Sequence, residues 1–489
     1  MDAGTLAGAS AAVAAFINGN FTDISRLCLP TVEDGIVLQK REVVNSCGTF
    51  CFTQFPYLKS YLPFAFFVCL NYNSSCRKIA ERRISMFEEL IDIYHLKCAG
   101  TDFYRALPES SDFSCWLSPS FLREINRDWL FLEEEPFSAL LAAAEKLSVL
   151  PDLCALASSA RSLLFETDYS VDYLVHLGFP RPDTEDPLIN DFFGLIVHLS
   201  GIGIVEKRYR NRGIPLSYMR QSYRSVKIWI DSFHAFYGRW GHDRECPRMV
   251  FIENFRFLRI GRLEFEMDRF YGKVIALRNK NGTEVLLSEG DILMNPDGLI
   301  TNTNGYWDPH CIRTGFRETS DAYYGHLISK GRLSAGISCF EKNDWKPLIR
   351  RGEKCVNIHI PRDGHLDLSA AMNSLMEAAD FFRTWFPEWE IPVFQCHSWL
   401  LDNTLEKLLG NQSNIISFQK LFTLFPEEST DYGALISIFS EAPFDLETWE
   451  PATSLQKKVK DFYQTGGKLH NAGGYLSSER IERSFISSP

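Results

Sequence analysis

The spacing of apolar residues divides this chain into two parts. Up to about residue 245 they recur every three or four positions, as in segments 136–150, 183–205 and 216–237. This spacing predicts amphipathic helices, because it places apolar side chains on one face. In the last segment, that face contains Met219, Val226, Trp229, Ile230 and Phe233. The first part is therefore expected to be mostly helical.

Beyond residue 246 the pattern changes to short β-prone pieces. The predicted strands are residues 262–267, 273–277, 284–287, 356–360, 393–401, 434–439 and 468–476. Helices are expected at 368–386, 413–422 and 454–463. Residues 279–352 are rich in Gly, Asn and Asp and predict an inserted, hairpin-rich arm. The Ser-rich end after residue 476 is expected to fray.

These patterns indicate an α+β protein. The expected organisation is a helical domain over residues 1–245, followed by a mixed α/β domain over residues 246–489. Within the second domain, residues 356–422 read as strand, polar turn, helix, strand and helix. Polar residues at strand ends in such a unit are typical of an α/β site.

Composition excludes several classes of protein. The 489 residues carry a net charge of −11 with 45% hydrophobic residues, which argues against a nucleic-acid-binding protein and against global disorder. The 13 cysteines contain no C-x-x-C pair, so reduced thiols in a cytoplasmic protein are expected rather than disulfides or a metal site. No basic leader precedes the apolar amino terminus, and neither a signal peptide nor a membrane span is expected.

Several spaced motifs resemble a known family. They are GRLEFE (261–266), HIP (359–361), FP (386–387), CHSWLLD (396–402) and SNIISFQ (413–419), with a similar stretch at 223–241. In this order they resemble a bacterial family of acyltransferases that pairs a helical N-acyltransferase N-terminal domain with a GNAT-like C-terminal domain. The resemblance is strong over the second half of the chain and weak over residues 110–215.

The resemblance implies an acyl-CoA, or an acyl-carrier protein, as the acyl donor and an amine as the acceptor. Strand 356–360 would bind the pantetheine arm through the backbone of Ile358 and Ile360. The diphosphate would lie on the following turn, as anions do at helix N-termini. The donor-binding residues implied beyond the strand are Arg362, Gly364, His365 and Asn414.

The chain departs from the family pattern at two places. The turn contains one glycine, and Asp363 and Asp367 there are expected to repel a diphosphate. Leu421 stands where a tyrosine often protonates the departing thiolate in this superfamily. Either another group supplies that proton, or the carrier differs, or the domain no longer catalyses.

The candidate catalytic residues are His359, Glu264, Ser398 and Cys396. His359 points away from the apolar face of its strand and could act as a general base, or it could be a hydrogen-bonded core histidine. Glu264 could accept the proton of an attacking ammonium, although a salt-bridged strand face explains it equally. Cys396 and Ser398 share one face of their strand, with His397 on the other, and they could polarise the acyl carbonyl, line a thioester channel or simply pack.

Three functions therefore remain open from the sequence. The first is a GNAT-like N-acyltransferase working by direct attack without a metal. The second is a non-catalytic GNAT-like module that binds a ligand or a protein. The third is a thiol-dependent hydrolase or transferase that uses Cys396.

Overall fold

The computed structural model describes residues 113–486, apart from residues 178, 243–246, 302–305, 429 and 440–447. All of these described residues belong to one compact unit, Ser75–Pro489. The amino-terminal segment, where we expect neither a leader nor a membrane span, lies outside them. Among the described helices, none alone has the length and apolarity of a membrane span; only α10 and α11 together, bent by 40°, meet both criteria.

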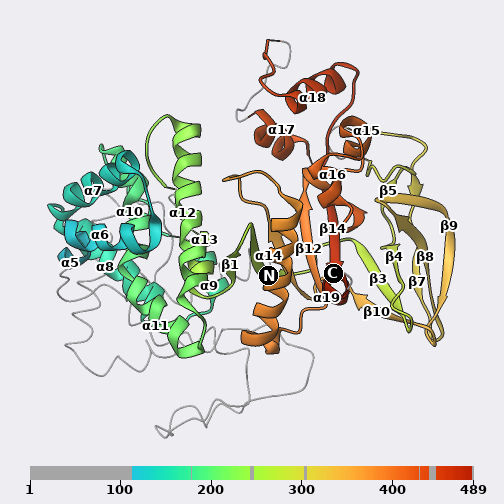
Figure 1. The fold of residues 1–489 in the computed structure, drawn as a ribbon, viewed down its shortest axis with the longest axis horizontal. Coiled ribbons are helices and arrows are strands. Elements are labelled where there is room, and N and C mark those ends of the chain that lie inside the picture. Colours follow the sequence, from blue (N-terminus) through green and yellow to red (C-terminus); the bar gives the residue numbers. More distant parts are fainter. Residues whose placement is uncertain are drawn as a thin grey trace, which may run out of the picture. The chain divides into compact units, whose positions relative to one another are not determined.

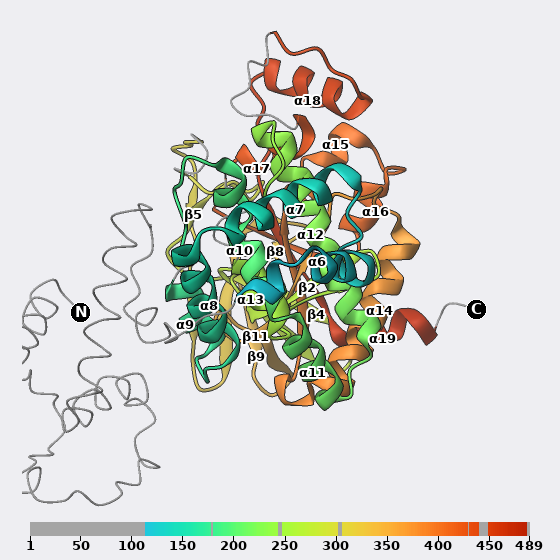
Figure 2. The ribbon, with the colours of Figure 1, turned by 90° about the vertical axis from the view of Figure 1, so that its left-hand side faces the viewer.

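Helices make up the described chain before residue 257 (Figures 1 and 2). They are α5 (Ser114–Leu117), α6 (Pro119–Ile125), the π-helix η4 (Asn126–Leu130), α7 (Glu134–Ser148), α8 (Pro151–Phe165), α9 (Val171–Leu177), α10 (Pro187–Ser200), α11 (Ile202–Arg212), α12 (Leu216–Tyr237) and α13 (Pro247–Glu253). The helices predicted at 136–150 and 216–237 are confirmed as α7 and α12. Figure 2 shows α7 and α10 packed side by side.

The single helix predicted over residues 183–205 is wrong, because the chain breaks at Gly201 between α10 and α11. The ring of Phe165 lies against this glycine, and a Cβ atom there would come within 2.1 Å of it. The apolar spacing continues through the break, so periodicity alone could not reveal it. Close packing against α8 requires the glycine.

Six strands form the first sheet, in the order β1-β2-β11-β12-β14-β13 (Figure 1). They are β1 (Phe257–Ile260), β2 (Leu263–Arg269), β11 (Lys354–His359), β12 (Val393–Ser398), β13 (Thr423–Pro426) and β14 (Ala472–Ser477). Only β11 and β12 pair in parallel, and α14 (Leu368–Trp385) makes the crossover between them. The expected α+β class, with a helical region before a GNAT-like sheet, is confirmed.

The two faces of this sheet differ in polarity. On one face, Phe265 and Phe394 contact Phe382 of α14, and one hydrophobic core joins this face to the helices before residue 257. The opposite face, which we call the polar face, carries carboxylate, amide and imidazole side chains. By strand register its members are Glu264, Glu266, Asp268, Asn357, His359, Gln395 and His397.

A second sheet occupies most of the segment expected to be rich in hairpins. Its strands are β3 (Val274–Asn279), β4 (Glu284–Ser288), β7 (Phe316–Glu318), β8 (Ala322–Ser329), β9 (Arg332–Glu341) and β10 (Trp345–Ile349), and all of their pairings are antiparallel. The same segment of the chain also contains a separate two-stranded sheet, formed by β5 (Leu293–Met294) and β6 (Ile312–Arg313). Val274, Leu286 and Ile328 share a core with Cys355 and Val393 of the first sheet.

Small helices complete the carboxyl-terminal part, and they correct two predictions. These elements are η5 (Pro387–Trp389), η6 (Trp399–Leu401), α15 (Leu405–Leu409), α16 (Asn414–Gln419), α17 (Tyr432–Phe439), α18 (Ser454–Gln464) and α19 (Ser478–Ile486). The strand predicted at 434–439 is the helix α17, because Ala434 and Ile438, four residues apart, are buried in a common core. The tail expected to fray is α19, held by buried Ile481.

A buried ion pair lies where the helices meet the first sheet. His198 Nδ1 of α10 is 2.8 Å from Glu253 Oε1 of α13, and the two side chains are 0% and 1% exposed. Burial raises the pKa of Glu253, and His198 opposes that shift. Removing one partner leaves the other carboxylate or imidazole uncompensated.

We predict that His198→Leu lowers the free energy of unfolding by about 3–5 kcal/mol, because the buried Glu253 carboxyl loses its side-chain partner in the core. Urea unfolding followed by fluorescence measures the change. Glu206→Ala, which removes the exposed Arg210–Glu206 pair of α11, serves as the control and should cost no more than about 0.5 kcal/mol. An equal, small effect of both substitutions would contradict this assignment.

Candidate functional site

The parallel strands β11 and β12 separate near their carboxyl ends. Their ladder consists of Val356↔Phe394, Asn357↔Gln395 and Ile358↔Cys396, and it stops there. β11 continues to pair with β2 at His359↔Glu264, while β12 continues to pair with β14 through Ser398↔Ala472. Each strand thus follows its antiparallel neighbour, and a splay opens between them. Ile358 is buried at the last pair, and half-buried Ile360 follows beyond it.

Arg262 shapes the turn that follows β11. Its Nη2 donates to the carbonyl oxygens of Pro361 and Gly364 at 2.8 and 2.6 Å, and its Nε donates to that of His365 at 3.0 Å. The Arg262 backbone N–H donates to Ser374 Oγ of α14 at 2.7 Å. One side chain from the β1–β2 hairpin therefore orders the whole turn.

The two acidic residues of the turn are engaged by other groups. Arg259 Nη2 lies 2.5 Å from Asp363, and Arg262 Nη1 lies 3.7 Å from it. Asp367 caps α14 by accepting a hydrogen bond from the Ala370 N–H at 2.7 Å. The repulsion of a diphosphate that we expected from these carboxylates is therefore weakened, because each already has its own partner.

The residues implied to bind a donor surround this turn. Gly364 and His365 are exposed, and Arg362 Nη2 reaches Ser437 Oγ of α17 at 3.2 Å. Asn414 is the first residue of α16, exposed, with Ser413 as the N-cap. Arg362 thus joins the turn after β11 to a helix more than 60 residues later in the chain.

His359 lies on the polar face beside the splay and is oriented by a carboxylate. Its Nε2 is 3.0 Å from Glu266 Oε2, and its ring packs 5.4 Å from that of Phe257. In the neutral tautomer that donates Nε2–H to Glu266, the other ring nitrogen is able to accept a proton. This carboxylate–histidine arrangement is that of a general base.

Glu264, paired with His359 across the strands, is more deeply buried at 4% exposure. Ser225 Oγ of α12 donates to its Oε1 at 2.5 Å. Burial raises the pKa of Glu264, while the Ser225 hydrogen bond and the nearby His359 and Arg259 oppose that shift. Glu264 thus lies beside His359 on the neighbouring strand, and its hydrogen bond from Ser225 connects the site to the helical part of the chain.

Cys396 and Ser398 lie on the opposite face of the sheet, as their spacing predicts. Cys396 is 1% exposed, and burial raises the pKa of its thiol well above the usual range. A nucleophilic thiolate needs the opposite environment, so the structure does not favour the thiol-dependent reaction. Ser398 Oγ caps η6 by accepting from the Leu400 N–H at 3.2 Å.

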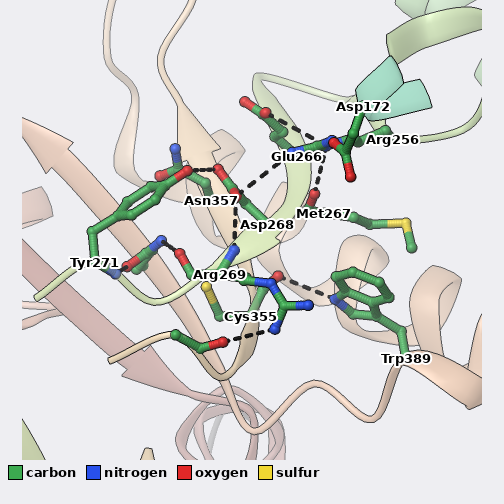
Figure 3. A network of polar contacts seen from close by, with 12 residues as sticks. Asp172, Arg256, Glu266, Met267, Asp268, Arg269, Tyr271, Cys355, Asn357 and Trp389 are labelled. Atoms are coloured by element: carbon green, nitrogen blue, oxygen red, sulfur yellow. Dashed lines mark hydrogen bonds and ion pairs between the residues drawn. The ribbon is translucent and has the colours of Figure 1, made fainter. Parts of the chain in front are cut away.

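Several residues of the site escaped sequence reasoning. Arg256 links carboxylates of the polar face, lying 4.0 Å from Glu266 and 3.7 Å from Asp268, and it also pairs with Asp172 of α9 (Figure 3). The Tyr271 hydroxyl donates to Asp268. Figure 3 shows the dashed contact between the Tyr271 hydroxyl and Asp268.

Asn357, another residue of the polar face, did carry a signal in the sequence. Asn357 alternates with apolar Val356 and Ile358, as His359 does, which marks it as polar-facing. The partners of Arg256 lie on separate elements, so no local pattern indicates them. Within the part of the chain that the structure describes, no group of three or more His, Cys, Asp or Glu residues could hold a metal ion.

We predict that Arg262→Lys loosens the turn without unfolding the protein, because an ammonium cannot reach three carbonyl oxygens in the manner of a guanidinium. Losing one charged hydrogen bond costs about 1.5–3 kcal/mol, so amide exchange over residues 361–370 should accelerate roughly 10-fold or more. Arg332→Lys on exposed β9 is the matched control. Unchanged exchange in Arg262→Lys would refute the role of this side chain.

We also predict that Glu264→Gln removes a stabilisation of the folded state that the wild-type protein has at low pH. The pKa of Glu264 is raised in the folded state. The folded protein therefore holds this proton more tightly than the unfolded chain, and the contribution falls as pH rises through the ordinary glutamate range. Unfolding measured between pH 4 and 7 should show Glu264→Gln gaining stability relative to wild type as pH increases. If the free energies of unfolding of Glu264→Gln and wild type differed by the same amount at every pH, this prediction would be wrong.

Comparisons with known proteins agree with this architecture. Residues 257–476 match the sequence model of the GNAT-like C-terminal domain family. The fold is similar to that of an acyltransferase in complex with decanoyl-CoA, with a TM-score of 0.52 and 17% identity over 77% of this chain and 93% of that one. A mutant acyltransferase in complex with octanoyl-CoA gives a TM-score of 0.51 and 18% identity over 85% and 99%. None of the curated proteins matches the chain. Residues 257–476 thus form a GNAT-like domain within a fold shared with acyltransferases.

Proposed function

We propose that this protein is an N-acyltransferase that moves an acyl group from an acyl-CoA to an amine acceptor by direct attack. The observation that carries the proposal is the splay after Ile358↔Cys396, with the His359–Glu266 pair beside it. An extended pantetheine arm would pair with the strand edge that β12 no longer covers, as an added strand does. The acyl carbonyl would then lie next to His359.

The chemistry requires a base and an outlet for the leaving group. The amine nitrogen attacks the thioester carbon, and His359 accepts the proton that the nitrogen loses. The carbon–sulfur bond then breaks, and the CoA sulfur takes a proton from His359 or from water. Glu266 stabilises the imidazolium formed in between. The cycle leaves amide, CoA thiol and one released proton when the acceptor enters as an ammonium.

Two features support an acyl-CoA as the donor. In the turn between β11 and α14, Asp363 is already paired with Arg259, and Arg362 and His365 are exposed where a diphosphate would lie. The two acyltransferases of similar fold are bound to decanoyl-CoA and octanoyl-CoA. We infer a medium-chain acyl-CoA as the first donor to test. We propose in addition that an acyl-carrier protein can replace CoA as the carrier of the acyl group. We also propose that the protein is bacterial and works in the cytoplasm.

One observation favours a second function. Leu421 takes the place of the expected proton-donating tyrosine, and its carbonyl oxygen accepts from Arg480 Nη2 at 3.1 Å. The segment therefore has a packing role. A GNAT-like module that binds acyl-CoA, or another ligand, without transferring the acyl group would have this arrangement.

The test separates binding from transfer. Thermal unfolding is measured with CoA, acetyl-CoA and octanoyl-CoA, since a ligand at 100 times its Kd stabilises the folded state by about 2.7 kcal/mol. We expect octanoyl-CoA to raise the melting temperature of wild type and of His359→Gln. Arg362→Glu should lose the shift, and Lys346→Glu on exposed β10 should keep it.

Release of CoA thiol in the presence of primary amines measures transfer. We expect His359→Gln to lose roughly 10²–10⁴-fold in rate, the usual contribution of a positioned base. Binding of octanoyl-CoA by wild type without any thiol release would favour the non-catalytic module. Failure of every thioester to raise the melting temperature of the wild-type protein would refute the acyl transfer and favour a module that binds another ligand.

A further inference from the structure

A second histidine–carboxylate pair faces the splay from the other strand. His397 of β12 contacts Glu427 through Nδ1, and Glu427 directly follows β13. Since Asn357 pairs with Gln395, His397 and His359 each lie two residues further along their strands, on the same polar face. The splay is thus flanked by two carboxylate-oriented imidazoles, one on each parallel strand.

Two buried polar atoms on the polar face have no hydrogen-bond partner within the described part of the chain. His397 Nε2 and Asn357 Oδ1 are both buried, and neither has a hydrogen-bond partner among the described residues. In the neutral tautomer that donates its Nδ1 proton to Glu427, the Nε2 atom of His397 presents a lone pair. Both atoms can therefore accept a hydrogen bond from a bound ligand. Leaving a buried polar group unsatisfied is costly, and native proteins seldom do so without a functional reason.

The groups around His397 make this spot suitable for a cation. The Tyr271 ring lies 5.5 Å from the His397 ring and its hydroxyl is held by Asp268, while the Phe425 ring lies 6.0 Å away on β13. Glu427, from the residues after β13, contacts His397 directly.

The positive charges nearby are already engaged. Arg256 pairs with Asp172 and with the two β2 carboxylates, and Lys273 pairs with Glu428 at 2.8 Å. No further Lys or Arg of the described residues forms an ion pair with Glu427. Within the described residues, an incoming ammonium at His397 would therefore meet two acceptor atoms without partners and a Glu427 carboxylate that forms no ion pair with a Lys or Arg.

Building on the proposed acyl transfer, we propose that His397, oriented by Glu427, is a second catalytic base that receives the acceptor amine in its ammonium form together with Asn357. His397 Nε2 takes one proton from the ammonium and generates the free amine. The amine attacks the thioester carbon, and His359 takes the second proton from the nitrogen. That proton passes to the departing sulfur as the carbon–sulfur bond breaks. The first proton leaves from His397 to solvent, so the protons balance without a tyrosine.

The experiment compares two nucleophiles that differ in charge. Ethanolamine is an ammonium near pH 7, whereas hydroxylamine is largely uncharged there. For His397→Gln and Glu427→Gln, transfer from octanoyl-CoA to each nucleophile is followed by thiol release between pH 6 and 9. His310→Gln, an exposed histidine of the second sheet region, is the control.

We expect His397→Gln to lose roughly 100-fold or more with ethanolamine at pH 7 and much less with hydroxylamine. The loss with ethanolamine should diminish as pH rises, because the amine then loses its proton unaided. Added imidazole should restore part of the activity of His397→Gly. If the substitution affected folding alone, the rate of thiol release would fall equally with both nucleophiles, and added imidazole would not restore it.

Other outcomes overturn the inference, and they are distinguishable from failure of the acyl transfer itself. Equal losses with both nucleophiles, or no loss, would exclude His397 as the base for the ammonium. Wild type that binds octanoyl-CoA and releases thiol with neither nucleophile would favour the non-catalytic module, and this inference would then fall together with the proposed transfer. Wild type without any shift by octanoyl-CoA would also overturn the proposed function on which this inference rests.

Discussion

The parallel pairing of β11 and β12 is the constraint on which the rest of this domain depends. Parallel neighbours cannot be joined by a tight turn, so α14 must cross over one face of the sheet. Its burial there leaves the polar face to carry the charged side chains. Beyond Ile358 and Cys396 the parallel ladder stops, while β11 stays paired with β2 and β12 with β14. The splay lies between these two antiparallel pairs.

Burial explains why the polar face is a network. A carboxylate removed from water is tolerated when it is paired and hydrogen-bonded. Glu266 meets His359 and Arg256, Glu264 meets Ser225, and Glu427 meets His397. The same pairing orients both imidazoles, so the contacts that make burial possible also prepare the rings for proton transfer.

The helical part of the chain takes part in the site directly. Ser225 of α12 supports Glu264, and Asp172 of α9 pairs with Arg256 (Figure 3). The hydrophobic core runs without a break from these helices to the sheet and α14. A substitution in α12 can therefore alter the environment of His359 without touching the GNAT-like residues. This coupling distinguishes the protein from a GNAT-like domain acting alone.

Much of the architecture followed from local pattern. The spacing over 216–237 predicted α12, and the motif around HIP indicated β11 with its polar turn, because amphipathic periodicity and proline punctuation act through neighbours in sequence. His359 and Glu264 were also identified as polar residues on strands. The helix α17 was missed, since the burial of Ala434 depends on distant residues that local propensity does not include.

The sequence by itself thus determined most helices and strands, with the exceptions of α17, α19 and the break at Gly201, and it determined which strand faces are polar. Tertiary structure alone decided the pairings: Glu266 with His359, Glu427 with His397, and Arg262 with three carbonyl oxygens of the turn. The physical reason is that periodicity repeats over a few residues. The distance between two charges depends on how strands far apart in the chain are ordered in the sheet.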